Sequence, residues 1–308
     1  MTAGALPILF HETYEVEIGP HVFPTAKYRL VLERLLDEGT IAEADVIRPE
    51  PATDEQIALV HTAEYIEKIR TGRFTLHEQF LLEVPFSEAL REASWICAGG
   101  SIRGARLALE SEGPGCAVHL GGGFHHAFPD HGEGFCLIHD VAVAIRVMLR
   151  ERAIERAVVI DCDVHHGNGT AAIFANEPAV FTFSIHQERN YPAVKPPSDL
   201  DLGLDDGTGD EEYIALLEEH VPRILERQRP QLAFYLAGAD PYREDQLGGL
   251  ALTTAGLRRR DELVLRDLTE RGIATVIALA GGYARRLDDT VEIHCNTVRA
   301  AKAAFADG

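Results

Sequence analysis

Residues 158–169 read VVIDCDVHHGNG. The apolar start of this stretch, Val158–Ile160, is typical of a buried strand, and two aspartates, two histidines and a glycine turn follow it directly. In parallel sheets with helical crossovers, ligands bind outside the carboxyl ends of the strands. The stretch therefore predicts a strand of a parallel sheet with a polar site at its end.

Four other apolar runs have the same design, and each ends in glycine, histidine, aspartate or tyrosine. They are CAVHLGGG from Cys116, AVFTFSIH from Ala179, QLAFYLAGAD from Gln231 and ATVIALAGGY from Ala274. Segments with helical spacing lie between the runs: DVAVAIRVMLRERAIE from Asp140, DEEYIALLEEHVPRILERQ from Asp210 and TTAGLRRRDELVLRDLTERG from Thr253. This alternation predicts an α/β fold in which a mainly parallel central sheet lies between two helical layers.

The composition favours one enzyme-sized domain and excludes an anionic partner. No Pro/Ser-rich linker or charge block divides the 308 residues, so we expect a single domain over residues 1–308. The net charge of -20 repels nucleic acid and anionic membranes and favours cationic substrates. We therefore expect neither a nucleic-acid nor a membrane partner.

Cysteine usage and the N-terminus predict a cytoplasmic protein. The five cysteines are scattered in apolar contexts without CxxC pairing, which indicates free thiols in a reducing compartment. The first residues lack a basic segment followed by a long apolar one, and no apolar run approaches the ~20 residues of a membrane span.

Asp163 and His165 form a candidate metal-binding pair. Residues two apart on an extended segment point to the same side, so a carboxylate and an imidazole can bind one ion. Asp240, at the end of YLAGAD, is the best candidate for a third ligand because it ends another predicted strand. An Asp/His/Asp set with open positions suits a catalytic Zn²⁺. Taken alone, Asp163 and His165 are equally compatible with the cap of a turn.

The tandem pair His125–His126 follows three glycines in the stretch HLGGGFHH. The glycines permit a tight backbone path that presents both imidazoles to a pocket. Beside a metal-bound water, one histidine can act as general base and the other as electrostatic stabiliser or general acid. Asp161 and Asn168 are the candidate partners for their remaining ring nitrogens. Tyr283, after the glycines of AGGY, is a candidate donor to a developing oxyanion.

In order and in combination, GGGFHHAFPDHGEGFCLIHD, VVIDCDVHHGNGT, GADPYREDQLGGLALTTAGL and AGGY resemble the zinc-dependent histone deacetylase family, with its arginase/deacetylase fold. The resemblance covers most of the chain. Two stretches, PPSDLDLGLDDGTGDEEYIALL and GGLALTTAGLRRRDELVLRD, look most like bacterial deacetylases and the class IV branch.

The resemblance implies a role for each candidate. Asp163, His165 and Asp240 would bind one Zn²⁺, His126 would be the general base, His125 its electrostatic or acid partner, and Tyr283 would polarise the acyl carbonyl. Asp161 would orient His125, and Asn168, where the family often has aspartate, would orient His126. The substrate would lie against Gly134, Phe135, Tyr191 and Leu247. A monovalent-cation site, K⁺, would involve Asp161, Asp163, His165, Ser184 and the carbonyl of Ile185. The acidic residue at the rim cannot be aligned, and Glu83 is a candidate; His139 stands where many relatives have asparagine.

The implied activity is zinc-dependent hydrolysis of an N-acyl amide, foremost the deacetylation of acetyl-lysine in proteins or peptides. Long-chain acyl-lysine and acetylpolyamine are alternative substrates; the implied partner is thus an acylated lysine or another cationic acyl-amine.

Two rival functions fit the sequence less well. A two-metal ureohydrolase of the same fold needs further bridging carboxylates. Gly167 and Gly238 stand at the positions that would carry them. A non-catalytic acyl-amine binding protein would be expected to have lost a ligand or the tyrosine, and all are present.

Overall fold

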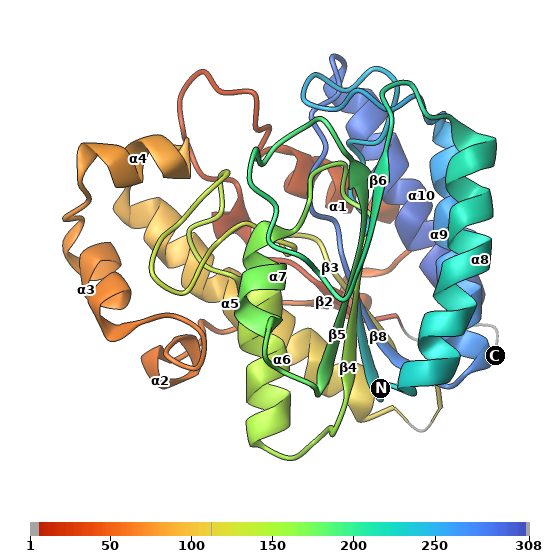
Figure 1. The fold of residues 1–308 in the computed structure, drawn as a ribbon, viewed down its shortest axis with the longest axis horizontal. Coiled ribbons are helices and arrows are strands. Elements are labelled where there is room, and N and C mark those ends of the chain that lie inside the picture. The colour runs from red at the N-terminus through yellow and green to blue at the C-terminus, as the bar shows by residue number, and fades with distance from the viewer. Residues whose placement is uncertain (1–5, 112, 306–308) are drawn as a thin grey trace.

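The computed structural model describes residues 6–111 and 113–305. Within this part of the chain, eight strands form one sheet in the order β2-β1-β3-β8-β7-β4-β5-β6, and every strand pairs parallel with its neighbours (Figure 1). The strands are β1 (Ile8–Leu9), β2 (Val46–Ile47), β3 (Cys116–His119), β4 (Ala157–Asp161), β5 (Val180–Gln187), β6 (Leu200–Leu204), β7 (Leu232–Leu236) and β8 (Ala274–Ala278).

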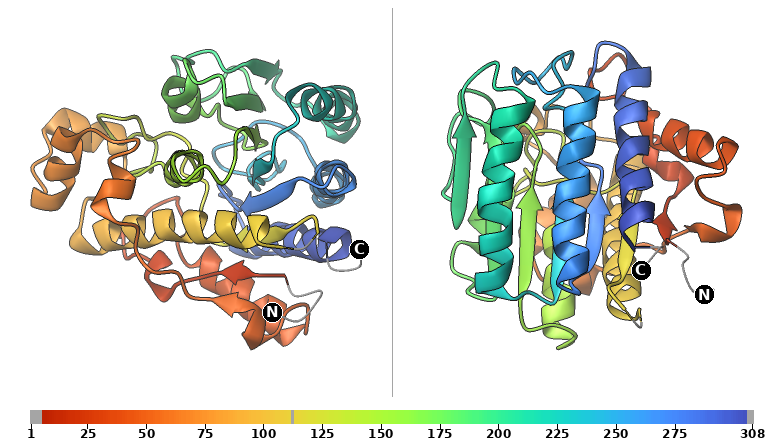
Figure 2. Two further views of the ribbon diagram at one scale, coloured as in Figure 1. Left: turned by 90° about the horizontal axis from the view of Figure 1, so that it is seen from below. Right: turned by 90° about the vertical axis from the view of Figure 1, so that its right-hand side faces the viewer.

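Helices cover both faces of the sheet (Figures 1 and 2). One layer holds α8, α9 and α10, with α1 packed on α10; the other holds α5, α6 and α7, and α2, α3 and α4 lie outside it. The helices are α1 (Lys27–Asp37), α2 (Asp54–Ile57), α3 (Ala63–Thr71), α4 (Leu76–Leu82), α5 (Glu88–Leu109), α6 (Asp140–Arg150), α7 (Asn168–Phe174), α8 (Asp210–Gln228), α9 (Thr254–Glu270) and α10 (Leu287–Phe305). Two short 3-10 helices span Glu12–Tyr14 and Glu43–Asp45.

The apolar core lies on both sides of the central strands, as expected for a parallel sheet covered on both faces. All residues of β3, β4, β7 and β8 are buried. Alternate residues of β4 pack into opposite layers: Val158 joins the cluster beneath α8–α10, whereas Val159 joins the cluster beneath α5 and α6. The predicted three-layer α/β fold is confirmed.

All five predicted strands are present, as β3, β4, β5, β7 and β8. Strands β1, β2 and β6 were not anticipated, because β1 and β2 have two residues each and β6 is half exposed at the sheet edge. Adjacent β3, β8, β7 and β4 end at the same edge of the sheet, so the segments after them lie together.

The cysteines and the helices can also be compared with the sequence-based expectations. All five cysteines are free and buried, as predicted. Among the described residues, no helix combines the length and apolar character needed to cross a membrane.

Candidate metal and catalytic site

The three candidate metal ligands meet beyond the ends of β4 and β7. Ligand atoms of Asp163, His165 and Asp240 all lie within 4.8 Å of one another. The Nδ1 atom of His165 lies 3.0 Å from Asp163 Oδ1 and 3.4 Å from Asp240 Oδ2. The β4–β7 pairing explains this convergence, because Asp161 and Leu236 are opposite each other and both chains continue in the same direction.

This cluster has the properties of a cation site. Asp240 Oδ2 is buried and has no hydrogen-bond partner among the described residues. Burial and the charge of Asp163 raise the pKa of Asp240 to about 7. A bound cation would offset the repulsion between the two buried carboxylates and would give the unpaired oxygen a partner. Two carboxylates and one imidazole suit Zn²⁺ with open coordination positions.

Gly281 allows the loop after β8 to approach the cluster. Its backbone N–H donates to Asp163 Oδ2 over 2.8 Å, and a Cβ at this position would lie 1.9 Å from Asp240 Oδ2. Any side chain here would displace a ligand. Gly238 is similarly close, since a Cβ there would lie 2.7 Å from Asp163 Oδ2. This position, where a second metal would need a carboxylate, therefore has no room for a side chain.

The tandem histidines lie beside this cluster with different partners. Their ring centroids are 4.0 Å apart. His125 Nδ1 donates to Asp161 Oδ2 over 2.6 Å, and His126 Nδ1 donates to Asn168 Oδ1 over 2.6 Å. In both rings, therefore, Nδ1 is occupied and Nε2 is left for chemistry.

The surrounding charges shift the pKa values of the two rings in opposite directions. Burial alone would lower the pKa of His125, but the charges of Asp161 and Asp163 outweigh it and raise the pKa to about 9. Burial and the neighbouring charge of His125 hold the pKa of His126 well below its ordinary value. One ring is thus cationic and the other neutral near pH 7, as an acid and a base acting together require.

A buried polar network fixes the glycine-rich loop that carries the pair. The carboxylate of Asp140, at the start of α6, accepts hydrogen bonds from the backbone N–H groups of Gly123 and Phe124 over 2.9–3.2 Å. Ser101 on α5 donates a further hydrogen bond to it.

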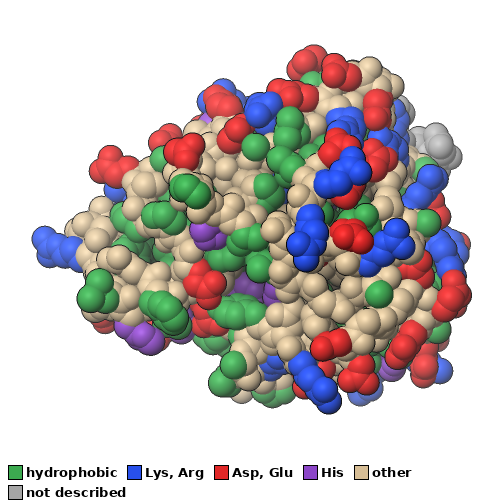
Figure 3. All heavy atoms as spheres, turned by 90° about the horizontal axis from the view of Figure 1, so that it is seen from above, with side chains coloured by type: hydrophobic (Ala, Val, Ile, Leu, Met, Phe, Trp, Pro, Cys, Tyr) green, Lys and Arg blue, Asp and Glu red, His purple; other side chains and the backbone are tan. Residues whose placement is uncertain are grey.

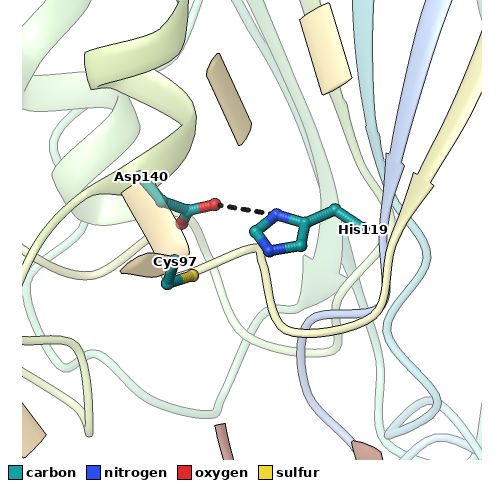
Figure 4. A group of neighbouring side chains, drawn as sticks. All are labelled: Cys97, His119 and Asp140. Carbon is teal, nitrogen blue, oxygen red and sulfur yellow. Dashed lines mark ion pairs between the residues drawn. The ribbon is translucent and has the colours of Figure 1, made fainter. Parts of the chain in front are cut away.

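Cys97, His119 and Asp140 form a second group of potential metal ligands (Figure 4). Here the ligand atoms are already engaged, because both His119 nitrogens make hydrogen bonds, one with Tyr14 and one with Ser101. The Cys97 thiol donates to the Gly121 carbonyl oxygen. We read this group as support for the loop.

Tyr283 enters the site from the loop after β8. Its backbone N–H donates to Asp245 Oδ2 over 2.6 Å, which fixes the loop. Burial and the charges of Asp163 and Asp240 raise the pKa of its phenol well above the usual value, so the hydroxyl remains a donor. Its ring packs edge-on against Phe135, with centroids 5.9 Å apart.

An open cleft leads to these groups. Figure 3 looks down on the carboxyl ends of the strands and shows histidine side chains in a hollow surrounded by hydrophobic ones. His126 and Tyr283 line the cleft together with all four predicted substrate contacts and Glu83. The cleft is lined by Glu83, His126, Gly134, Phe135, His165, Asn190, Tyr191, Leu247 and Tyr283.

Gly134 keeps this cleft open. Its φ is +51°, which favours glycine, and a Cβ would lie 2.7 Å from His126 Cδ2 and 2.9 Å from Tyr191 Cε1. A side chain would therefore block the space between the candidate base and the cleft wall.

Comparison with known proteins agrees with this geometry. Residues 21–298 match the histone deacetylase domain. The chain belongs to the histone deacetylase family. It is therefore a hydrolase of the deacetylase/amidohydrolase type, acting on amides.

Relatives of this histone deacetylase-family chain span similar lengths. It is 39% identical to an uncharacterized protein of Picosynechococcus over 97% of this chain and 99% of the relative. It is 31% identical to the histone deacetylase-like amidohydrolase of Pseudomonas aeruginosa over 84% of this chain and 71% of that one. The crystal structure of the HDA15 HD domain superposes with a TM-score of 0.81 at 24% identity, covering 98% of this chain and 89% of that one, and shows the same fold.

Several residues of the K⁺ site expected in this deacetylase-family chain lie on β4 and β5. Asp161 and Ser184 are opposite each other across β4 and β5, with Ile185 following in β5. The Ser184 hydroxyl lies 3.0 Å from His186 Nδ1. The K⁺ site stays a prediction.

Three residues close to the site were missed in the sequence. Glu133, inside the motif HGEGF, bonds Asn168. Asp245, inside GADPYREDQLGG, fixes the Tyr283 loop. Lys27 is fully buried and donates to the Ala280 carbonyl oxygen over 2.6 Å. The first two lie in quoted motifs, but no local pattern in the sequence marks Lys27 as buried.

His139 has a structural role in this deacetylase-family chain. It caps α6 by accepting from the Ala142 N–H, and its Nε2 lies 2.9 Å from Thr170 Oγ1. Both ring nitrogens of His139 are therefore engaged in hydrogen bonds that support the fold.

Proposed function

We propose that this protein is a single-domain, zinc-dependent hydrolase over residues 1–308 that removes an acyl group from an amine, foremost the acetyl group of acetyl-lysine in proteins or peptides. The observation that carries the proposal is that His165 of the metal cluster, His126 of the histidine pair and Tyr283 line one cleft. His125 and Asp163 line an adjoining pocket that also includes His126 and Tyr283. Family membership supplies the reaction class, and the side chains supply the roles.

Asp163, His165 and Asp240 would hold Zn²⁺, which in such sites activates water and polarises a carbonyl. His126 is the general base, because its ring is neutral and its Nε2 is free to accept a proton. His125 is held cationic by Asp161 and stabilises negative charge before protonating the leaving amine. Tyr283 donates a hydrogen bond to the oxyanion.

The cleft suits an extended acyl-lysine side chain. Phe135 and Tyr191 offer aromatic walls for its methylene groups, and Leu247 adds apolar surface at the same opening. Glu83 lies in the same lining and bears a carboxylate that can bind a substrate amide or ammonium group. The net charge of -20 favours cationic substrates in general.

A cavity next to the site favours a second candidate function, the removal of longer acyl chains. The cavity shares Phe23, Tyr28, Phe124 and Phe135 with the pocket that contains His125, His126 and Asp163. Its lining is mostly apolar and includes Val16, Ile18, Val84, Leu90 and Leu137. An acyl chain longer than acetyl would gain burial of apolar surface there.

The test is hydrolysis by the zinc-loaded protein of an acetyl-lysine peptide, a myristoyl-lysine peptide and acetylputrescine, with release of carboxylate and amine in equal amounts. Preference for the acetyl peptide supports the main proposal, and preference for the myristoyl peptide supports the second. Absence of turnover on all three with zinc bound contradicts both.

A further inference from the structure

Glu133 links the candidate base to the cleft wall. Its Oε1 accepts hydrogen bonds from Asn168 Nδ2 over 2.7 Å and from the Tyr191 hydroxyl over 2.9 Å. Its Oε2 lies 3.4 Å from His131 Nε2. The Glu133 side chain is 15% exposed, so these bonds lie largely out of solvent.

We infer that Glu133 is a positioning residue for His126, acting through Asn168, in the hydrolysis proposed above. The chain of contacts runs from the Glu133 carboxylate to the Asn168 amide and from that amide to the His126 ring. The inference rests on the proposed function for its effect on turnover, but its structural part can be tested separately.

Hydrogen-bond chemistry sets the direction of this chain. An asparagine amide has a donor end and an acceptor end, whereas an ionised carboxylate only accepts. Glu133 therefore turns the Asn168 Nδ2 toward itself and leaves Oδ1 facing His126. That oxygen in turn requires a proton on His126 Nδ1, which keeps Nε2 unprotonated and able to act as a base.

The charge of Glu133 is maintained by its surroundings. Burial would raise its pKa, but hydrogen bonds from His131, Tyr191 and Asn168 outweigh it and hold the pKa below its ordinary value. The charge of Glu133 also contributes to the raised pKa values of Glu83 and Cys136. An ionised acceptor polarises a chain of hydrogen bonds in a low-dielectric site, so Asn168 Oδ1 becomes a stronger acceptor for His126.

The same carboxylate oxygen also holds Tyr191. The Tyr191 ring packs edge-on against His126, with centroids 5.0 Å apart and an interplanar angle of 86°. Glu133 thus sets both the base and one wall of the cleft. Its loss is expected to affect kcat through His126 and KM through Tyr191.

A charge exchange tests this role. Asn168→Asp alone would place a second carboxylate against Glu133, and like charges at this separation cannot both stay ionised. Glu133→Gln alone would remove the charge. The double variant Asn168→Asp/Glu133→Gln restores one carboxylate and one amide in exchanged positions, so an amide N–H can again meet a carboxylate oxygen.

We expect kcat/KM to fall about thirtyfold in Asn168→Asp and about tenfold in Glu133→Gln, and to return to within about threefold of the wild type in the double variant. Asp130→Asn is the matched control, because Asp130 is an exposed acid bonded to the other nitrogen of His131. It should leave kcat/KM unchanged. Losses in the double variant that equal or exceed the product of the single losses would overturn the inference.

A second measurement does not depend on turnover. Ring ¹⁵N spectra of histidine-labelled metal-free protein, assigned with His126→Ala, should show His126 protonated on Nδ1 in the wild type and a mixture of tautomers in Glu133→Ala. An unchanged tautomer in Glu133→Ala would overturn the positioning role. Wild-type inactivity on every acyl amide, with the expected tautomer change, would overturn the proposed function and confine Glu133 to orienting the ring.

Discussion

His125 and His126 lie with their ring centroids 4.0 Å apart, yet one Nδ1 meets a carboxylate and the other an amide. These different partners give two chemically identical side chains different protonation states. Asp161 favours the imidazolium form of His125, and that charge in turn disfavours protonation of His126. The neighbouring side chains therefore determine that His125 is the acid and His126 the base.

Asp161→Asn should abolish the difference in pKa between His125 and His126. Without the carboxylate, the pKa of His125 falls from about 9 toward or below neutrality, so the cationic form is lost as pH rises at a lower pH than in the wild type. We expect kcat to drop about a hundredfold near pH 8 and the alkaline limb of its pH profile to move to lower pH. Steady-state kinetics from pH 6 to 10 measures both.

Asp199→Asn is the control for this change. Asp199 bonds Thr182 on β5, and no hydrogen bond joins it to the candidate catalytic residues in the part of the chain that the structure describes. Its profile should overlie that of the wild type. An unshifted alkaline limb in Asp161→Asn would refute the assignment of the acid.

Asp240→Asn should remove zinc binding without unfolding the protein. The Asp240 carboxylate is buried beside Asp163 with one oxygen unpaired, so neutralising it relieves repulsion in the metal-free state. Zinc at a thousand times its Kd should stabilise the wild type by about 4 kcal/mol. We expect no zinc-dependent rise in Tm for the variant, measured by calorimetry with and without the metal.

Tyr283→Phe should keep the full zinc-dependent rise, because the variant retains Asp163, His165 and Asp240 as ligands. A zinc response in Asp240→Asn equal to that of the wild type would place the metal elsewhere.

His61 should contribute to acid unfolding. Burial holds its pKa at about 4. Its Nδ1 donates to the Phe128 carbonyl oxygen, and its Nε2 accepts from the His139 N–H. Because the unfolded chain binds more protons between pH 6.5 and 4, the stability from neutral His61 is complete above pH 6.5 and is lost as pH falls toward 4.

His61→Gln should make the free energy of unfolding less dependent on pH. Between pH 7 and 4 the variant should lose about 3 kcal/mol less unfolding free energy than the wild type, although it starts less stable. Urea unfolding at several pH values gives the comparison, and the other buried histidines contribute equally to both proteins. Parallel curves would show that His61 does not titrate as a buried neutral group.

Ala93→Leu should change the preference for acyl length. Ala93 lies on α5 in the lining of the apolar cavity, so a larger side chain fills space that a long acyl chain would occupy. We expect turnover of a myristoyl-lysine peptide to fall about tenfold, the effect of losing roughly two buried methylene groups. Turnover of the acetyl-lysine peptide should change by less than about twofold. Equal losses on both peptides would indicate that the cavity does not receive the acyl chain.

Much of the site could be predicted because strand ends converge. Asp163, Asp240 and Tyr283 each follow an apolar run that sequence patterning identifies as a strand, and parallel strands bring their carboxyl ends to one edge. The pairing of His125 with Asp161 and of His126 with Asn168 followed from the resemblance and matches the contacts.

Other features depend on contacts between distant segments. Glu133 and Asn168 are 35 residues apart, and nothing in either segment marks their hydrogen bond. The amide of Asn168 brings no charge of its own to His126, but the structure places the Glu133 carboxylate one hydrogen bond further away. Burial of Lys27 was equally hidden, because its partner, the Ala280 carbonyl oxygen, is 253 residues away.

The most direct test of the central claim is turnover by zinc-loaded wild type and by zinc-loaded Tyr283→Phe on the preferred acyl-lysine peptide. Both proteins should bind one zinc, and kcat/KM should be about 10² to 10³ lower in the variant, because only the hydrogen bond to the oxyanion is lost. Equal turnover in the two proteins, or none in the zinc-bound wild type, would contradict amide hydrolysis at this site.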